Sequence, residues 1–404
     1  MHSQTKYIIT KQDVHDYANL WLGAALKLEY QGYKCNDVML LQILLIAAAR
    51  VVSIFAACRD LADAPSDDTI RNALFATLPE IAELEKRINR ALCTEIPKAL
   101  NRKSRKIAID LTLIPYHGEP AKDEKEIYRS KPKSGTSHFH AYATAVVVHK
   151  GYRYTLALTY VQRGEALKEV VQRLIRLVRK QGVKVKYLLL DKEFCSVEVM
   201  QYLKRAKLGF IIAAPVRGRK KKKGAATGLR ALRKRKNGYY SHTFTREKSG
   251  KTTRVKVAIC VAGKSYLHKK TGKKKYKKLL YAIWKVRKTP KEIREEYRKR
   301  FGVETSYRQM HQARIKTCTR DPRLRLLFVG VALVLRNVWA WLHFRLAKSK
   351  YSEEPILFLE LLRFQEMLLW ITQIVQRDLG AAETEGIELE EYQRLVARKL
   401  AGQN

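Results

Sequence analysis

The segment RKIAIDLTLIPY, residues 105–116, decides how the rest of the chain is interpreted. It is rich in β-branched and other apolar residues, a composition typical of a strand, and Asp110 lies in its middle. A lone carboxylate in an apolar strand is costly to bury unless it faces a cleft or meets a cation. Asp110 is therefore the best single candidate for a functional acid.

Strands and helices alternate along the chain around and after this segment. Apolar patterning predicts three strands, at 107–116, 138–149 and 152–161, followed by a helix at 165–180. A strand at 185–190, a helix at 196–206 and a last strand at 209–215 complete the series. This is the element order of an RNase H-like core. We therefore expect an α/β fold with a mixed-sheet catalytic core formed by residues 101–216 and 279–346.

Helical patterning predicts further regions on both sides of this core. Residues 1–100 read as a helical DNA-binding domain, in which a helix-turn-helix and a plain helical bundle fit equally well. A helix should begin at Pro290 and run to about Lys316. The apolar stretch 326–344 contains Arg336 and Asn337, so we expect a buried helix rather than a membrane span. Residues 347–404 form an acidic helical region.

The charge of the chain points to a polyanionic partner. Lys and Arg total 81 against 38 Asp and Glu, a formal net charge of +43. Residues 217–278 hold 24 Lys or Arg and one acid, and strand patterns at 239–245 and 253–261 predict a basic β-rich insertion. We expect this insertion to clamp the DNA backbone through a lysine run, Lys220, Lys221, Lys222 and Lys223. The six cysteines show no zinc-ligand spacing.

Two further carboxylates stand at informative positions. Asp191 follows the apolar strand 185–190, at the end of a strand where active sites of open α/β sheets cluster. Glu304 lies on the helix after the insertion, and its spacing from Tyr297, Arg300 and Arg308 places all four on about one helical face. Two or three converging carboxylates would suit two-metal phosphodiester chemistry with Mg²⁺, which prefers oxygen ligands.

These residues resemble the DDE transposases of bacterial and archaeal insertion sequences, in the branch with a Tyr-x2-Arg-x3-Glu-x6-Lys signature. Tyr297, Arg300 and Glu304 match the signature, and the segments 109–112, IDLT, and 191–194, DKEF, are similar to the blocks that hold the family's two aspartates. His311 stands where the family has Lys. Lys316 is a candidate to replace it.

The resemblance implies a function for each matching residue. Asp110, Asp191 and Glu304 would bind Mg²⁺, or Mn²⁺ in its place, and carry out strand cleavage at transposon ends and 3′-OH transfer into target DNA. Tyr297, Arg300 and Arg308, with His311 and Lys316, would contact DNA. It also implies double-stranded DNA as partner and at least a dimer in the synaptic complex, and we expect a cytoplasmic, nucleoid-associated protein.

Three other functions remain open at this stage. A metal-dependent nuclease of the same fold would use the same carboxylates without rejoining DNA. A DNA-binding protein derived from a transposase would have lost catalysis, which the intact Asp110, Asp191 and Glu304 argue against. A membrane-surface binder would use the basic charge on anionic lipid, but we expect no membrane partner.

Overall fold

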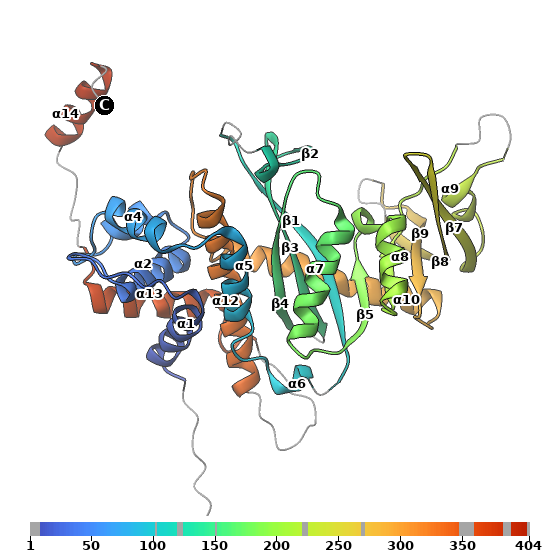
Figure 1. The fold of residues 1–404 in the computed structure, drawn as a ribbon, viewed down its shortest axis with the longest axis horizontal. Helices are drawn as coiled ribbons and strands as arrows, with labels where there is room; N and C mark the ends of the chain where they lie inside the picture. The colour runs from blue at the N-terminus through green and yellow to red at the C-terminus, as the bar shows by residue number, and fades with distance from the viewer. Residues whose placement is uncertain are drawn as a thin grey trace, which may run out of the picture.

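The computed structural model describes residues 9–101, 103–118, 124–149, 152–219, 225–267, 271–346, 359–382 and 389–401. Within these ranges the chain forms a mixed α/β fold. A long sheet occupies the middle, a helical bundle lies at one end, and strands of the basic insertion lie at the other (Figure 1).

The middle of the sheet has the predicted RNase H-like element order. β1 (Arg105–Pro115) pairs antiparallel with β3 (Thr136–His149) and parallel with β5 (Val185–Leu190). β4 (Tyr152–Val161) pairs with β3, and β6 (Phe210–Ala213) pairs parallel with β5. The crossover helices are α7 (Leu167–Lys180) and α8 (Val197–Arg205). Their apolar faces are buried, as expected for helices that cover a sheet.

The insertion is rich in strands, and these strands belong to the same sheet as the core. Its strands are β7 (Gly238–Lys248), β8 (Lys251–Leu267) and β9 (Lys274–Trp284). β8 pairs antiparallel with both β7 and β9, and β9 also pairs with β6 of the core. One nine-stranded sheet therefore runs through both parts. Two elements had no sequence signal strong enough to predict them, the polar strand β2 (Tyr128–Lys133) and the short helix α9 (Gly228–Leu232).

The N-terminal helices form a packed bundle. Its members are α1 (Lys11–Leu26), α2 (Asp37–Arg50), α3 (Ile54–Arg59), α4 (Asp67–Thr77) and α5 (Ile81–Leu92), and the short helix α6 (Lys98–Asn101) follows before β1. Ser66 caps α4 by accepting from the Thr69 N–H, as the Pro65 turn predicts. α13 (Phe364–Leu379) packs on α1 and α2, while the last described helix is α14 (Leu389–Leu400). That one bundle helix enters a DNA groove stays a prediction.

The helix α12 (Pro322–Leu346) joins the bundle to the sheet. It is the one helix among the described residues that is long and apolar enough to cross a membrane, yet its apolar window is entirely buried inside the protein. It packs against α5, α1 and β4. The predicted buried helix is therefore present as a core helix.

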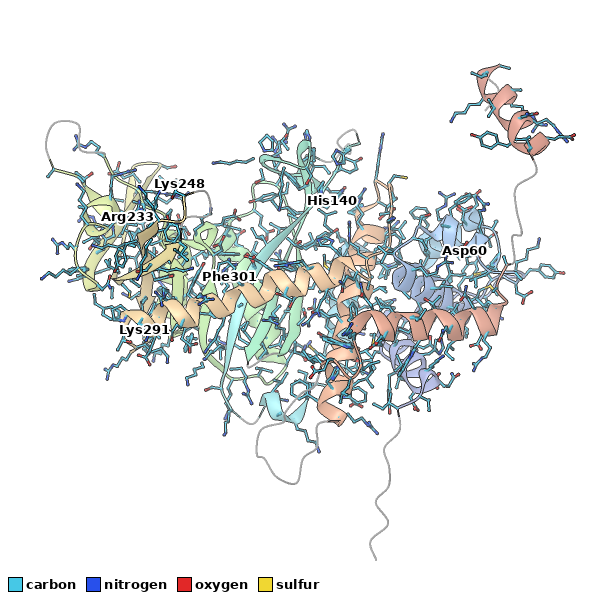
Figure 2. All side chains as sticks on the ribbon, turned by 180° about the vertical axis from the view of Figure 1, so that it is seen from behind. Asp60, His140, Arg233, Lys248, Lys291 and Phe301 are labelled. Atoms are coloured by element: carbon cyan, nitrogen blue, oxygen red, sulfur yellow. The ribbon has the colours of Figure 1, made fainter. Side chains whose placement is uncertain are left out.

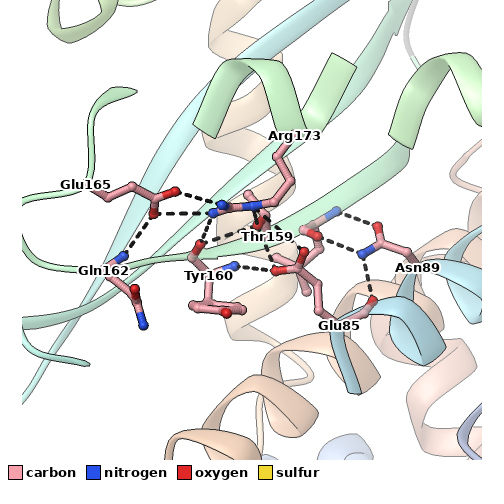
Figure 3. A network of polar contacts seen from close by, with 8 residues as sticks. Glu85, Asn89, Thr159, Tyr160, Gln162, Glu165 and Arg173 are labelled. Carbon is pink, nitrogen blue, oxygen red and sulfur yellow. Dashed lines mark hydrogen bonds and ion pairs between the residues drawn. The ribbon is translucent and has the colours of Figure 1, made fainter. Parts of the chain in front are cut away.

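Polar side chains connect the bundle to β4, the edge strand of the core (Figure 3). Asn89 of α5 donates to the Leu158 carbonyl at 2.8 Å and accepts from the Leu158 N–H at 2.9 Å. Glu85 accepts from the Thr159 hydroxyl at 2.7 Å. Asn337 of α12 bonds the N–H and carbonyl of Thr155 in the same way, at 3.0 and 2.7 Å. Side chains thus satisfy backbone groups that an unpaired edge would leave open.

Candidate active site

Strand register brings Asp110 and Asp191 together. β1 and β5 run parallel, and Ile109 is the Cα partner of Leu190. The next residue on each strand is an aspartate, Asp110 within β1 and Asp191 directly after β5. The pair therefore follows from the sheet topology alone, since neighbouring parallel strands carry equivalent positions side by side.

Glu304 and Arg300 come from the helical segment that crosses the sheet. This segment comprises α10 (Pro290–Arg298), a 3₁₀ turn η3 (Lys299–Phe301) and α11 (Gly302–His311). Figure 2 shows it as one nearly continuous rod, with Lys291 near one end and Phe301 part-way along. η3 packs on β3, and α11 packs on β1 and β3. Across this turn Tyr297, Arg300 and Glu304 still face the same cluster, and Tyr297 and Arg300 are buried there while Arg308 is exposed.

The Arg300 guanidinium lies at the centre of the three carboxylates. Its Nη1 is 2.8 Å from Asp110 Oδ2, and its Nη2 is 3.2 Å from Glu304 Oε1 and 3.6 Å from Asp191 Oδ1. The side chain of Arg300 is only 5% exposed, whereas that of Glu304 is 44% exposed. Carboxylates from three separate segments thus meet at one buried cation.

Tyrosine hydroxyls hold two of these groups in place. Tyr297 donates to Asp191 Oδ1 at 3.1 Å. Tyr307 donates to the Asp110 carbonyl at 2.8 Å and lies 2.8 Å from the Thr144 hydroxyl. Tyr307 and Thr144 were not predicted as site residues. Their signal was weak, because an aromatic seven residues after Arg300 and a threonine in an apolar strand are both ordinary core residues.

Burial shapes the electrostatics of the cluster. Burial, with a smaller contribution from the neighbouring Asp191, raises the pKa of Asp110 to about 6 despite the opposing effect of Arg300. Burial alone would lower the pKa of Arg300, but Tyr297 and the three carboxylates raise it above its usual value. Arg300 therefore stays charged. Its positive charge does not fully offset the effect of burial on Asp110, whose pKa remains raised.

The donor chemistry of the cluster fits a divalent cation. Asp110, Asp191 and Glu304 offer carboxylate oxygens, the ligands that Mg²⁺ and Mn²⁺ accept. In the part of the chain that the structure describes, no three acidic, histidine or cysteine side chains already enclose a common metal position. The carboxylates are instead turned toward Arg300.

The residues predicted to contact DNA differ in their exposure to solvent. Tyr297 and Arg300 are buried and contact the carboxylates, and that they hold DNA stays a prediction. Arg308 and His311 are exposed on α11. Lys316 is also exposed, but the helix ends at His311 instead of Lys316, and the Lys316 N–H bonds the Val52 carbonyl at 3.0 Å.

The lysine run Lys220, Lys221, Lys222 and Lys223 lies outside the described residues. A different basic surface is described where the insertion meets the core. A groove of about 830 Å³ lies between α8 and the sheet, and none of its lining residues is acidic. Its cations are Lys204, Lys256, Lys285, Arg287 and Lys288.

A comparison with known families decides the class of the protein. The family model of the transposase DDE domain matches residues 101–337, which is more than half of the chain and includes all three carboxylates. The chain belongs to this transposase family. The matched region begins just before β1 and ends within α12.

A solved structure with a similar fold is that of a piggyBac transposase synaptic complex with hairpin DNA. Its TM-score to this chain is 0.52 at 12% sequence identity, and the alignment covers 98% of this chain and 91% of that chain. At this identity the likeness concerns the fold, including the helices outside the family match. In sequence, no curated protein matches the chain at a significant level.

Proposed function

We propose that this DDE-family transposase cleaves DNA strands at transposon ends and joins the resulting 3′-OH to target DNA, with Asp110, Asp191 and Glu304 as the catalytic acids. One observation carries the proposal: in a chain of this family, carboxylates from β1, the end of β5 and α11 converge on one point. The bacterial or archaeal insertion-sequence branch is part of the same proposal.

The chain's own residues have separate tasks in this mechanism. Asp110, Asp191 and Glu304 would hold Mg²⁺, or Mn²⁺ in its place. When bound, the cations activate the attacking oxygen and stabilise the leaving oxygen. Tyr297 fixes the orientation of Asp191, and Tyr307 ties the backbone at Asp110 to Thr144 on the neighbouring strand. These contacts keep the acids within a small volume before any substrate arrives.

Double-stranded DNA is the proposed partner. The net charge of +43 and the groove lined by five cations support it, because phosphate neutralisation dominates non-specific DNA binding. Arg308 and His311 are exposed on the helix that carries Glu304, so both are accessible to DNA on that helix. We further propose that at least two copies act together on paired ends, and that the protein works on the nucleoid in the cytoplasm.

Product analysis tests the proposal. We would incubate the protein with labelled DNA that carries the sequences flanking its gene, together with a circular target and Mg²⁺, Mn²⁺ or chelator. A transposase produces both nicked ends and joined products, and only with metal. Cutting without joining would indicate the nuclease. Binding without cutting would indicate an inactive derivative.

A further inference from the structure

Arg300 occupies an unusual place for an arginine in a DNA-processing site. Its guanidinium contacts all three acids, from 2.8 Å at Asp110 to 3.6 Å at Asp191. The rings of Tyr297 and Phe301 flank it, with centroids 5.6 and 5.1 Å from its central carbon. Such packing favours this position for the charge while no other cation lies between the acids.

The three acids need a cation in order to stay together. Three carboxylates that meet at a largely buried point repel one another, and the fold stabilises the arrangement only if positive charge lies between them. No second Lys or Arg forms an ion pair with Asp110, Asp191 or Glu304 among the described residues. Among the residues that the structure describes, Arg300 therefore supplies this positive charge by itself.

We propose that Arg300 is a positioning residue that stands in for the divalent cation: it holds the three acids together in the metal-free protein and moves aside when metal binds. This rests on the proposed function, because it assumes that the same acids bind metal. A guanidinium and a divalent cation repel each other at this range, so both cannot lie at the centre at once. Once displaced, the planar fork is suited to a DNA phosphate, which couples metal loading to DNA binding.

The proposal predicts opposite effects on stability and on metal affinity. Arg300→Gln removes the charge that holds the acids together, so the melting temperature in chelator should fall and should recover when Mn²⁺ is added. The same change removes the competitor for the site, so the Kd for Mn²⁺ without DNA should fall by about tenfold or more. Arg300→Lys keeps a charge without the planar fork. Its Kd for Mn²⁺ should lie between those of the unmodified protein and of Arg300→Gln.

The experiment is a calorimetric Mn²⁺ titration of the full chain without DNA, combined with thermal unfolding in chelator and in Mn²⁺. Arg308→Gln is the matched control, since it removes the same charge from an exposed position on the adjoining helix. Arg308→Gln should change neither the Kd for Mn²⁺ nor the melting temperature in chelator. Folded Arg300→Gln with unchanged or weaker Mn²⁺ binding would overturn the proposal, and Arg300→Lys provides the same test if the Gln variant does not fold.

A second variant separates this inference from the function on which it rests. Asp191→Asn should lose Mn²⁺ binding. If Asp191→Asn binds Mn²⁺ like the unmodified protein, the acids are not the metal site and the proposed function fails. If Asp191→Asn loses binding while Arg300→Gln binds like the unmodified protein, only the role of Arg300 is overturned.

Discussion

Glu296 and Arg300 lie four residues apart on one helical segment, and each is buried among groups of opposite charge. Glu296 accepts from the Tyr187 hydroxyl at 2.7 Å and pairs with Lys106 at 2.6 Å and Lys299 at 2.9 Å. This second cluster ties the start of the segment to β1 and β5. Glu296 therefore supports the position from which Arg300 reaches the acids.

Acid should weaken this support. Burial by itself would raise the pKa of Glu296, but the bonds from Lys106, Lys299 and Tyr187 lower it to about 2. A lowered folded-state pKa stabilises the protein above the usual Glu value near 4.5 and loses that stability as the pH falls toward 2. Glu296→Gln should cost roughly 2 kcal/mol at pH 7. Its loss of unfolding free energy between pH 5 and pH 3 should be smaller than in the unmodified protein; an equal loss would contradict this role.

His311 gives a prediction about DNA contact. Although His311 is solvent-exposed, desolvation by the protein around its ring, together with Arg314 and Lys133 nearby, lowers its pKa below 6.5, so the ring is mostly neutral at pH 7. His311→Lys adds a permanent charge and should strengthen DNA binding, steepening the salt dependence by about 0.9 in the log–log slope. Activity should be unchanged or higher. Gln312→Lys, the neighbouring control, should have less effect on cleavage; a large loss of activity in His311→Lys would reveal a separate role for the histidine.

At the scale of elements, the spacing of apolar residues predicted the strands and helices that have a buried face. The apolar strands β1, β3, β4 and β5 and the amphipathic helix α7 were predictable because each buries one side or both. The polar strand β2 was not, since its pairing with β3 leaves most of its side chains exposed. The pairing of β9 with β6 depends on contacts distant in sequence, which local patterns do not contain.

The same reasoning explains which parts of the site were predictable. Asp110 and Asp191 stood out because each interrupts or ends an apolar strand, and Glu304 stood out through its spacing from Tyr297. Arg300 was expected at a DNA surface, because an arginine is seldom buried unless it is paired. Its burial follows from three partners that converge only in the folded chain.

Asn337 provides a test of how the elements are joined. Asn337→Leu should leave the N–H and carbonyl of Thr155 on the edge strand without partners and destabilise the protein by roughly 2–4 kcal/mol. Leu335→Met, a swap of similar volume on the same helix, should cost less than about 1.5 kcal/mol. Denaturant unfolding of both variants measures the difference. Equal losses would show that the amide bonds do not matter.

At the scale of the whole molecule, β1 and β5, which position Asp110 and Asp191, lie between the helical bundle and the basic strands (Figure 1). The groove beside α8 belongs to the basic end. DNA that follows this surface would cross from the insertion toward the active site. The arrangement fits a molecule that grips the backbone on one side and positions one phosphodiester at its centre.

The groove prediction concerns salt dependence. Changing Lys256, Lys285 and Arg287 to Gln should weaken binding almost equally for all DNA sequences and should reduce the log–log salt slope by about 0.9 for each phosphate that the variant no longer neutralises. Changing Lys180, Lys184 and Lys186, exposed near the opposite end of β5, removes the same charge and should alter the slope less. DNA affinities measured at several salt concentrations give the slope for each triple variant. Identical slopes in the two variants would contradict a role of the groove in DNA binding.

Strand cleavage by single carboxylate variants tests the central claim most directly. Asp110→Asn, Asp191→Asn and Glu304→Gln remove one charge each from the cluster around Arg300, with little change in volume. On DNA carrying the flanking sequences, in Mg²⁺, each variant should bind DNA nearly as well as the unmodified protein and should show no strand cleavage. Cleavage at the unmodified rate in any folded variant would contradict the role of that acid, and cleavage by all three would refute the site.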